Sequence, residues 1–391
     1  MHRSENRILT THTGSLPRPA ALVALYASRN NGGSTDDAAM QQAIDAATRA
    51  AIAKQLENGI DIGNNGEQER ESFVLYVRHR MTGFGGRWQR FPRGDVEEYP
   101  LYKAMFERQL GQIVAVSNFF PPKAIGEVRY KDPSTAAEAP RAFRELLAQF
   151  EGRFVEAFMT APSPGIVASA IKNEHYASEE AYLTALGEAL RVEYEAIVTG
   201  GLLLQVDCPE LALERHLSFH RRPSAEFLSF VERSVAALNH SLRNIPRDRV
   251  RMHVCWGNYE GPHDCDVPLD LIWPIIRQAK VGGFVLPFAS ARHAHETRVL
   301  HALPPADDQI VVAGVIDQVS NVVEHPEVVA ERIVKVANAM GDPRRVLAGT
   351  DCGFDTSAGM GAVAADVAWA KLRSLRDGAK LATDQLFRGR P

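Results

Sequence analysis

The sequence predicts an α/β protein built as a (β/α)8 TIM barrel, and two observations lead to that fold class. Eight short runs of β-branched and other apolar residues recur along the chain, with amphipathic runs of helical spacing between most of them. Polar residues follow nearly every short run at its C-terminal end. Strands that alternate with helices form parallel sheets, and barrels of this class gather their functional side chains at the carboxyl ends of the strands. A doubly wound open sheet is the alternative that the same pattern allows.

The elements follow from these runs in chain order. The predicted strands are Arg7–Thr11, Asp61–Asn64, Phe154–Thr160, Leu202–Val206, Val250–Val254, Gly283–Leu286, Ile310–Gly314 and Val346–Thr350. The predicted helices are Asp37–Gln55, Glu179–Val198, Ala225–Leu242, Pro268–Ala279, Pro326–Met340 and Ala362–Leu375. The second interval between strands is the longest, so we expect an insertion at about residues 75–150 with a small β-hairpin. No linker interrupts the pattern, which predicts a single barrel domain over residues 1–391.

The overall composition excludes several classes of protein. The chain has 391 residues with 44 Lys and Arg against 48 Asp and Glu, and a net charge of −4 does not favour nucleic acid or an anionic membrane as a partner. No run approaches the roughly 20 apolar residues of a membrane span, and the N-terminus lacks a signal-peptide core. The four cysteines are too few for a disulfide scaffold. We therefore expect a cytoplasmic protein with reduced thiols.

Residues that can bind a substrate or transfer a proton follow the predicted strands. Because the carboxyl ends of parallel barrel strands meet at one mouth, we expect these side chains to lie at the same end of the molecule. The candidates outside the thiols are, in chain order, Ser15, Glu67, Asp207, Trp256, Tyr259, His263 and Asp317.

A metal site is predicted where the fifth and eighth strands end. His253 and Cys255 are alternate residues of one strand, so both side chains point to the same side of the sheet. Cys352 ends a strand 97 residues later, and closure of a barrel brings it alongside. Two thiolates and an imidazole suit a tetrahedral zinc site with one open position. Buried structural cysteines are the alternative interpretation.

Several of these motifs, in this order, resemble the cobalamin-independent methionine synthase family, specifically its catalytic C-terminal barrel. The resemblance extends from about Arg7 to about Ala370. It lies in the runs LTTHTGSLPRP from Leu9, Gly66-Glu67, QVDCP from Gln205, His253-Val254-Cys255 and Asp351-Cys352-Gly353. The runs CWGNYEGPH from Cys255 and RHAHE from Arg292 resemble short, single-barrel members, including proteins similar to epoxyalkane:coenzyme M transferase (2-hydroxypropyl-CoM lyase).

The resemblance implies alkyl transfer, most simply of a methyl group, to or from a small thiol such as homocysteine or coenzyme M. It implies zinc held by the two thiolates and the imidazole, which keeps the substrate thiol ionised near neutral pH. Glu67 and Asp207 would bind the amino group of an amino-acid thiol, and Ser15 would help to seat it. Trp256 and Tyr259 would wall the pocket, while Asp317 and His263 are candidates for proton transfer or, for His263, a replacement ligand.

Two departures from the family pattern keep other functions open. The family's fourth zinc ligand, a glutamate on the sixth strand, corresponds to Pro287, which cannot bind a metal. The histidine of the family's Asp-x-His-Ser run, an acid that helps the donor leave, corresponds to Val319. A metal-free lyase, hydrolase or decarboxylase and a ligand-binding barrel without catalysis are therefore alternatives. The alkyl donor, whether a folate, an epoxide or a corrinoid-borne methyl group, and a homo-oligomeric state are left open by the sequence.

Overall fold

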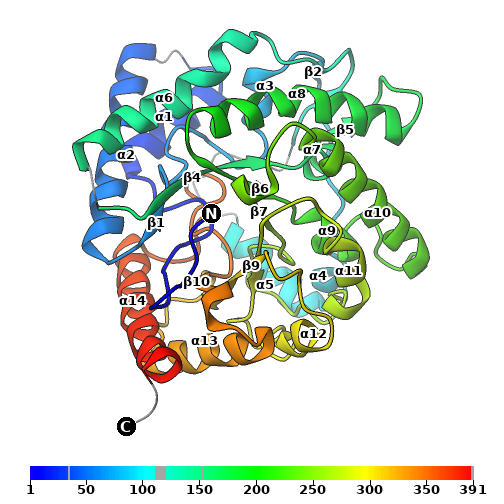
Figure 1. The fold of residues 1–391 in the computed structure, drawn as a ribbon. Coiled ribbons are helices and arrows are strands. Elements are labelled where there is room, and N and C mark those ends of the chain that lie inside the picture. The colour runs from blue at the N-terminus through cyan, green and yellow to red at the C-terminus, as the bar shows by residue number, and fades with distance from the viewer. Residues whose placement is uncertain (34–35, 111–119, 151–152, 389–391) are drawn as a thin grey trace.

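The computed structural model describes residues 1–33, 36–110, 120–150 and 153–388. Its main sheet has seven parallel strands in the order β1-β4-β6-β7-β8-β9-β10, and the sheet curls so that helices cover its outer side (Figure 1). The strands of this sheet are β1 (Ile62–Gly63), β4 (Glu156–Pro162), β6 (Leu203–Asp207), β7 (Val250–His253), β8 (Gly283–Pro287), β9 (Ile310–Ile316) and β10 (Val346–Thr350). Seven of the predicted strands therefore form within two residues of their predicted bounds.

The N-terminal segment lies between the two edge strands of the curled sheet. Thr10 forms a parallel bridge with Ala348 of β10, and Thr11 forms one with Ile62 of β1. The amide of Thr11 donates to the carbonyl of Ala348 at 2.8 Å, and the amide of Ile62 donates to the carbonyl of Thr10 at 3.0 Å. The predicted first strand thus contacts both edges, although only these two residues have a bridge pattern.

The helices follow the strands as the alternating pattern predicts. They are α1 (Ala20–Asn30), α2 (Asp37–Glu57), α3 (Val77–Arg80), α4 (Gly94–Glu97), α5 (Pro100–Leu110), α6 (Glu138–Leu147), α7 (Pro164–Ala170), α8 (Glu179–Thr199), α9 (Glu210–Leu213), α10 (Ser224–Ser241), α11 (Leu269–Ile276), α12 (Thr297–Ala302), α13 (Pro326–Met340) and α14 (Ala365–Phe387). None of the helices in the described ranges has the length and apolar content needed to cross a lipid bilayer.

Local sequence explains where α13 begins and ends, whereas packing decides the length of α14. The side chain of His325 accepts from the amide of Glu327, Pro326 occupies the first turn, and Gly341 ends α13 with φ +71°. We predicted that α14 would stop at Leu375, but it continues past Gly378 to Phe387. A Cβ on Gly378 would lie 2.5 Å from Cβ of Val329, so the glycine allows α14 to pack closely against α13.

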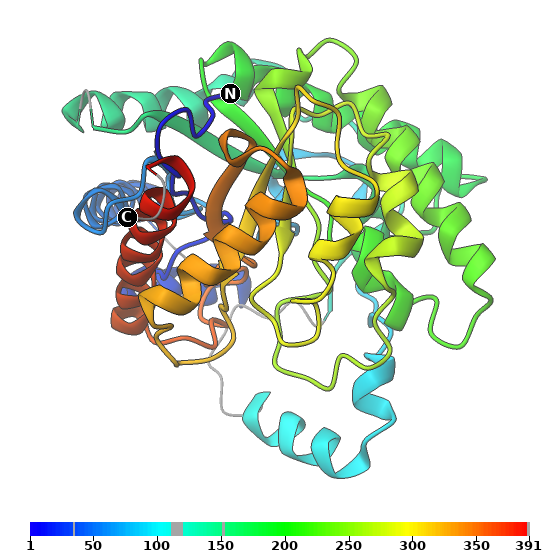
Figure 2. The same cartoon turned by 60° about the horizontal axis from the view of Figure 1, so that its bottom comes forward.

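The insertion between β1 and β4 contains helices as well as strands. Strand β2 (Phe84–Gly85) pairs antiparallel with β3 (Lys123–Ala124), which in turn pairs parallel with β5 (Lys172–Asn173). Because α4 and α5 lie between β2 and β3 in the chain, this antiparallel pair is not the small β-hairpin that we predicted. Figure 2 shows α5, in cyan, projecting from the main body of the protein.

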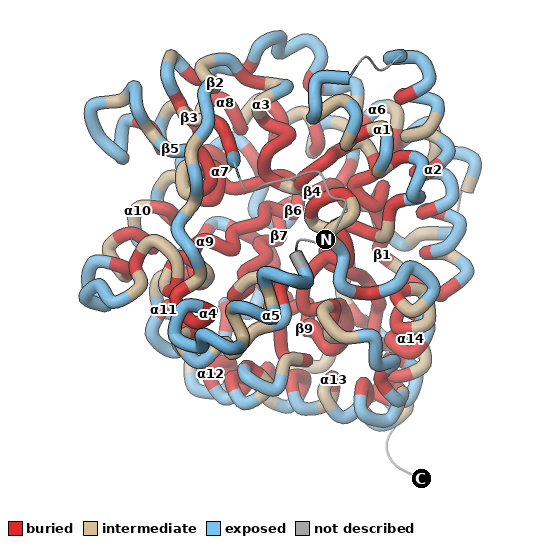
Figure 3. Tube along the Cα trace, turned by 180° about the vertical axis from the view of Figure 1, so that it is seen from behind, coloured by how far each residue is buried: buried red, intermediate tan, exposed pale blue. Residues whose placement is uncertain are grey.

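The strands are buried on both sides, as Figure 3 shows by colour. Leu9, Ile62, Phe158, Leu203, Val285, Ile310, Val312 and Leu347 form one buried cluster. These residues come from strands all around the sheet and from the N-terminal segment, so they meet on its inner side. Burial of apolar side chains on both faces makes the sheet a rigid support for the loops at its carboxyl end.

Candidate metal centre

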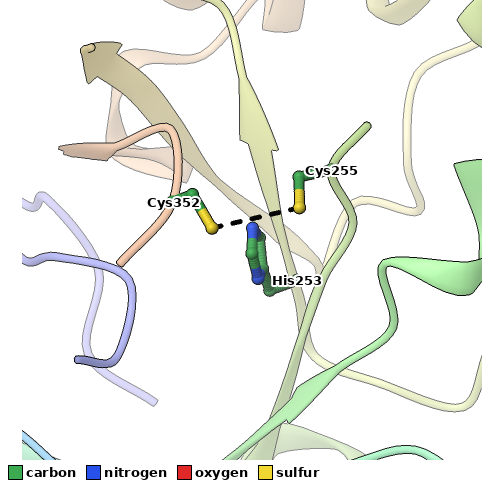
Figure 4. A group of neighbouring side chains, drawn as sticks. All are labelled: His253, Cys255 and Cys352. Carbon is green, nitrogen blue, oxygen red and sulfur yellow. Dashed lines mark hydrogen bonds between the residues drawn. The ribbon is translucent and has the colours of Figure 1, made fainter. Parts of the chain in front are cut away.

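The side chains of His253, Cys255 and Cys352 come together at the carboxyl end of the main sheet (Figure 4). His253 ends β7, Cys255 follows it, and Cys352 follows β10. One ligand atom from each of the three side chains lies within 4.8 Å of the others, and all three residues are buried. The sheet therefore brings together the trio that the sequence predicted as metal ligands.

The spacing of the two sulfur atoms fits a tetrahedral zinc ion. The Sγ atoms of Cys255 and Cys352 are 4.0 Å apart, and zinc–sulfur bonds of about 2.3 Å set two sulfurs about 3.8 Å apart. The Cys352 thiol can donate to the Cys255 sulfur, which lowers the pKa of Cys255 well below its usual value and raises that of Cys352. Cys255 therefore favours thiolate, the form in which cysteine binds metals.

Both ring nitrogens of His253 face an oxygen acceptor. Nδ1 lies 3.2 Å from Oδ1 of Asp207, and Nε2 lies 3.2 Å from the carbonyl oxygen of Asp351. Whichever nitrogen binds a metal, the other can donate its N–H to one of these acceptors, as metal-binding histidines usually do. Burial lowers the pKa of His253, but the neighbouring Cys255 thiolate and Asp207 outweigh it and raise the value to about 10. Without a cation the trio is thus a buried imidazolium beside a thiolate.

Asp351 fixes the loop that follows β8, where the family's fourth ligand is missing. Its Oδ1 accepts from the amides of Phe288 and Ala289 at 3.1 and 3.0 Å, and its Oδ2 accepts from Ser290 at 2.9 Å. Pro287 ends β8 and offers no donor atom to a metal. Among the described residues the cysteine-containing group therefore has three possible ligands, which leaves one tetrahedral position for another group.

Glu67 and Ser15 are buried at the same end of the sheet. Glu67 adopts a left-handed backbone with φ +57°, and its Oε1 accepts from the Thr160 hydroxyl at 2.8 Å. Its Oε2 has no hydrogen-bond partner in the described part of the chain. Burial and the charge of Asp207 raise the pKa of Glu67 to about 7. Ser15 Oγ accepts from the amide of Asp355 at 3.3 Å. The unpartnered carboxylate oxygen is the feature that a cationic substrate group would complement.

Trp256, Tyr259 and His263 have their polar atoms engaged within the protein. The indole of Trp256 donates to the carbonyl of Val267 at 2.7 Å, and the ring stacks on His293 with centroids 4.0 Å apart. The hydroxyl of Tyr259 donates to Asp95 at 2.5 Å. These residues form a second polar cluster in the loop after β7. None of the contacts just described joins that cluster to the thiols of Cys255 and Cys352.

The second cluster centres on a carboxylate between imidazoles. Asp266 lies 2.9 Å from His263 and 2.8 Å from His293, and Glu296 lies 3.0 Å from the other nitrogen of His293. Burial lowers the pKa of His293, but the two carboxylates outweigh it and raise the value to about 9. Burial raises the pKa of Asp266, but the hydrogen bonds from the histidines outweigh it and lower the value well below its usual range.

Asp317 follows β9, as predicted, and is half-buried. Its Oδ1 accepts from the amide of Val319 at 2.9 Å, and its own amide donates to Glu324 at 2.8 Å. Val319, which the resemblance aligns with the family's histidine, has no polar atom on its side chain. Cys208 is fully buried with its thiol 3.7 Å from the carbonyl of Val206, as a small core residue would be.

The sequence analysis missed two buried charged residues at this end of the sheet. Glu210 starts α9, accepts from the Ser163 hydroxyl at 2.6 Å, and has an Oε2 atom without a partner. Burial raises the pKa of Glu210 to about 8. Arg251, two residues before His253, donates to Gln205 at 2.9 Å inside the curled sheet. Glu210 lies three residues after Asp207, but nothing in that spacing distinguishes a buried carboxyl from an exposed one.

Comparison with known proteins identifies the family of this chain. Residues 103–380 match the family described as cobalamin-independent synthase, catalytic domain. The chain is 23% identical over 386 residues to a methionine synthase of Saccharolobus solfataricus, covering 97% of this chain and 96% of that one. It is 27% identical over 252 residues to a 5-methyltetrahydropteroyltriglutamate–homocysteine methyltransferase of Lactiplantibacillus plantarum, covering 64% of this chain and 29% of that one.

Solved structures share the fold. A B12-independent methionine synthase from Shewanella sp. W3-18-1, in complex with selenomethionine, superposes with a TM-score of 0.73 at 18% identity, covering 98% of this chain and 99% of that one. The putative vitamin-B12 independent methionine synthase from Listeria monocytogenes gives a TM-score of 0.63 at 18% identity, with 96% and 98% covered. The family match covers most of the chain, and the sequence motifs predicted the same family. This protein therefore belongs to the cobalamin-independent methionine synthase family, whose members are thiol S-methyltransferases.

Proposed function

We propose that this protein is a zinc-dependent S-alkyltransferase that moves an alkyl group, most simply a methyl group, to or from a small thiol such as homocysteine or coenzyme M. The observation that supports it is the pair of Sγ atoms 4.0 Å apart beside a buried imidazole. His253, Cys255 and Cys352 would hold the metal. Zinc supplies a charge that keeps the thiol of a substrate ionised at neutral pH.

The residues of the chain would bind and orient the thiol substrate. The unpartnered Oε2 of Glu67 and the carboxylate of Asp207 suit the ammonium group of an amino-acid thiol, which needs buried anionic acceptors. Ser15 is buried at the same end of the sheet and would help to seat the thiol substrate. Pro287 leaves the position of the family's fourth ligand to the incoming sulfur.

The reaction forms a bond between the substrate sulfur and the alkyl carbon, and the donor's leaving atom takes the electron pair of the bond that breaks. We assign the proton transfer at that leaving atom to Asp317, since Val319 has no acidic group. The structure gives no support to His263 in this role, because both of its ring nitrogens face Asp266 and the Tyr259 carbonyl.

Several finer points belong to the same proposal. Residues 7–11, the first predicted strand along the chain, would add an eighth strand to the seven of the main sheet and so close the barrel. The partners would be a small thiol and a folate, epoxide or corrinoid-borne donor, in a cytoplasmic enzyme. An epoxide donor needs no departing group, because ring opening leaves the oxygen on the product.

The test compares Cys352→Ser with the matched control Cys265→Ser, a half-buried thiol outside the metal group. We expect Cys352→Ser to lose one zinc per chain, because the site loses a thiolate ligand. Methyl transfer to homocysteine or coenzyme M should fall at least about 100-fold, which corresponds to about 2.7 kcal/mol. Cys265→Ser should keep both. A Cys352→Ser protein with full metal content and full activity would refute the proposal.

Pro287 and Val319 favour one second candidate, a metal-free lyase or decarboxylase in the same barrel. In that case the reaction would depend on Glu67, Asp207 and Asp317 as acids and bases. Turnover that survives complete removal of metal by a chelator would support this candidate, and loss of turnover with recovery on adding zinc would exclude it.

A further inference from the structure

The second polar cluster is a buried group of potential ligands that the proposed reaction does not use. Oδ2 of Asp266 lies 2.9 Å from Nδ1 of His263 and 2.8 Å from Nε2 of His293. The three ligand atoms lie within 4.8 Å of one another. His263 and Asp266 come from the loop after β7, and His293 comes from the loop after β8, so the cluster joins two loops at the mouth of the sheet.

Each of these three side chains has a partner on the side that faces away from the shared centre. Nδ1 of His293 lies 3.0 Å from Glu296, and Nε2 of His263 lies 3.1 Å from the carbonyl of Tyr259. The second oxygen of Asp266 lies 2.9 Å from Nδ1 of His216, an ion-pair distance without hydrogen-bond geometry, so the outer-shell hydrogen bonds come from the partners of the two histidines. Histidines that bind metals usually donate their other N–H to a carboxylate or a backbone carbonyl, and ligating carboxylates are themselves hydrogen-bonded. This arrangement is therefore the outer shell that a metal site requires.

Burial and charge also suit a cation at this centre. The side chains of Asp266 and His293 are 1% and 6% exposed, and Trp256 stacks on the His293 ring and covers it. Asp266 and Glu296 together supply two negative charges. A dication bound by His263, Asp266 and His293 would balance the charges of Asp266 and Glu296, provided that the imidazoles are neutral.

We propose that His263, Asp266 and His293 form a second metal site, distinct from the cysteine site, that binds a first-row divalent cation such as zinc or ferrous iron. Two imidazoles and one carboxylate are a ligand set that both ions accept. Ligand bonds of about 2.1 Å set neighbouring donor atoms about 3.4 Å apart in a tetrahedron. The present spacings of 2.8 and 2.9 Å would then widen as the ion replaces the shared protons.

The site would act by tying the loop that carries Cys255 to the loop after β8. Trp256 is the residue next to Cys255, and its ring is held by His293 on one side and by its hydrogen bond to Val267. An ion at this centre would fix the ring of His293. Through the stacked ring of Trp256 it would also fix the start of the loop after β7. The inference goes beyond the proposed transfer reaction and does not depend on it.

The experiment counts metals in protein purified without chelators or an immobilised-metal column. Elemental analysis by mass spectrometry would compare the wild type with His293→Gln, Asp266→Asn, Cys352→Ser and the double variant His293→Gln/Cys352→Ser. His240→Gln is the matched control, a histidine that pairs with Glu188 on the surface. We expect two ions per chain in the wild type and the control, one in each single variant, and none in the double variant.

A second measurement keeps the test valid if a variant fails to fold. Stripped Cys352→Ser protein, titrated with zinc alone, should bind one equivalent and melt about 2–4 °C higher with zinc in excess. An ion that Cys352→Ser retains and His293→Gln loses would support this site even if the cysteine site and the transfer reaction failed. No metal in Cys352→Ser together with no zinc binding by the stripped protein would overturn the proposal and leave an ion-paired hydrogen-bond network.

Discussion

The buried carboxyl of Glu210 makes one pH dependence of stability calculable. Burial raises its pKa from the ordinary 4.5 to about 8, so between these values the folded protein holds a proton that the unfolded chain has released. Because the pKa of Glu210 is higher in the folded state, binding of this proton stabilises the fold. This stabilisation is fully present below pH 4.5 and is lost as the pH rises through 8. With about 1.4 kcal/mol for each unit, the loss between pH 5 and pH 7.5 is about 3 kcal/mol.

The perturbation is Glu210→Gln, which keeps the shape and still accepts from the Ser163 hydroxyl but does not titrate. Urea unfolding of the wild type and the variant at pH 5, 6, 7 and 7.5 measures the difference in unfolding free energy at each pH. The change of this difference with pH tests the reasoning. The other titrating groups are the same in both proteins, and any free-energy cost of introducing the amide does not vary with pH. We expect the unfolding free energy of the variant, relative to that of the wild type, to rise by about 3 kcal/mol between pH 5 and pH 7.5. Parallel pH profiles would refute the reasoning.

Two further predictions concern the support of the site. Gly14→Ala should destabilise the fold by about 1–3 kcal/mol and raise the KM for the thiol, because the new Cβ would lie 2.5 Å from Oε1 of Glu67 at φ +71°. Gly341→Ala is the control, because Gly341 has the same φ but open space around it. It therefore shows the effect of backbone strain without the clash. Equal effects of the two variants on KM would contradict the prediction. Lys371→Met should cost about 3–5 kcal/mol in urea unfolding, because its ammonium, 2.9 Å from Glu324, is fully buried and the carboxylate would lose its partner. Adding Glu324→Gln should recover part of that loss, and no recovery would argue against the ion pair as the cause.

The arrangement of elements was largely predictable because each signal is local. Seven predicted strands form within two residues of their expected bounds, and α13 has the bounds Pro326–Met340 that its proline and its following glycine indicate. The end of α14 was missed, because a glycine weakens an isolated helix, whereas Gly378 here makes room for Val329. The helices α4 and α5 within the insertion were not predicted, because α4 has only four residues and α5 begins at a proline after a segment rich in Gly, Pro and Arg.

The sequence by itself determined the family, the order of the elements and the trio of candidate metal ligands. His253 and Cys255 are two residues apart, and the period of the predicted strand indicated one side for both, although β7 itself ends at His253. Only the tertiary structure decided the partners of His263. It pairs with Asp266, three residues away, but His293 reaches the same carboxylate from another loop. Periodicity reports which face a residue occupies, whereas contacts between distant loops depend on how the whole sheet curls and packs. The second cluster therefore has no signature in the sequence.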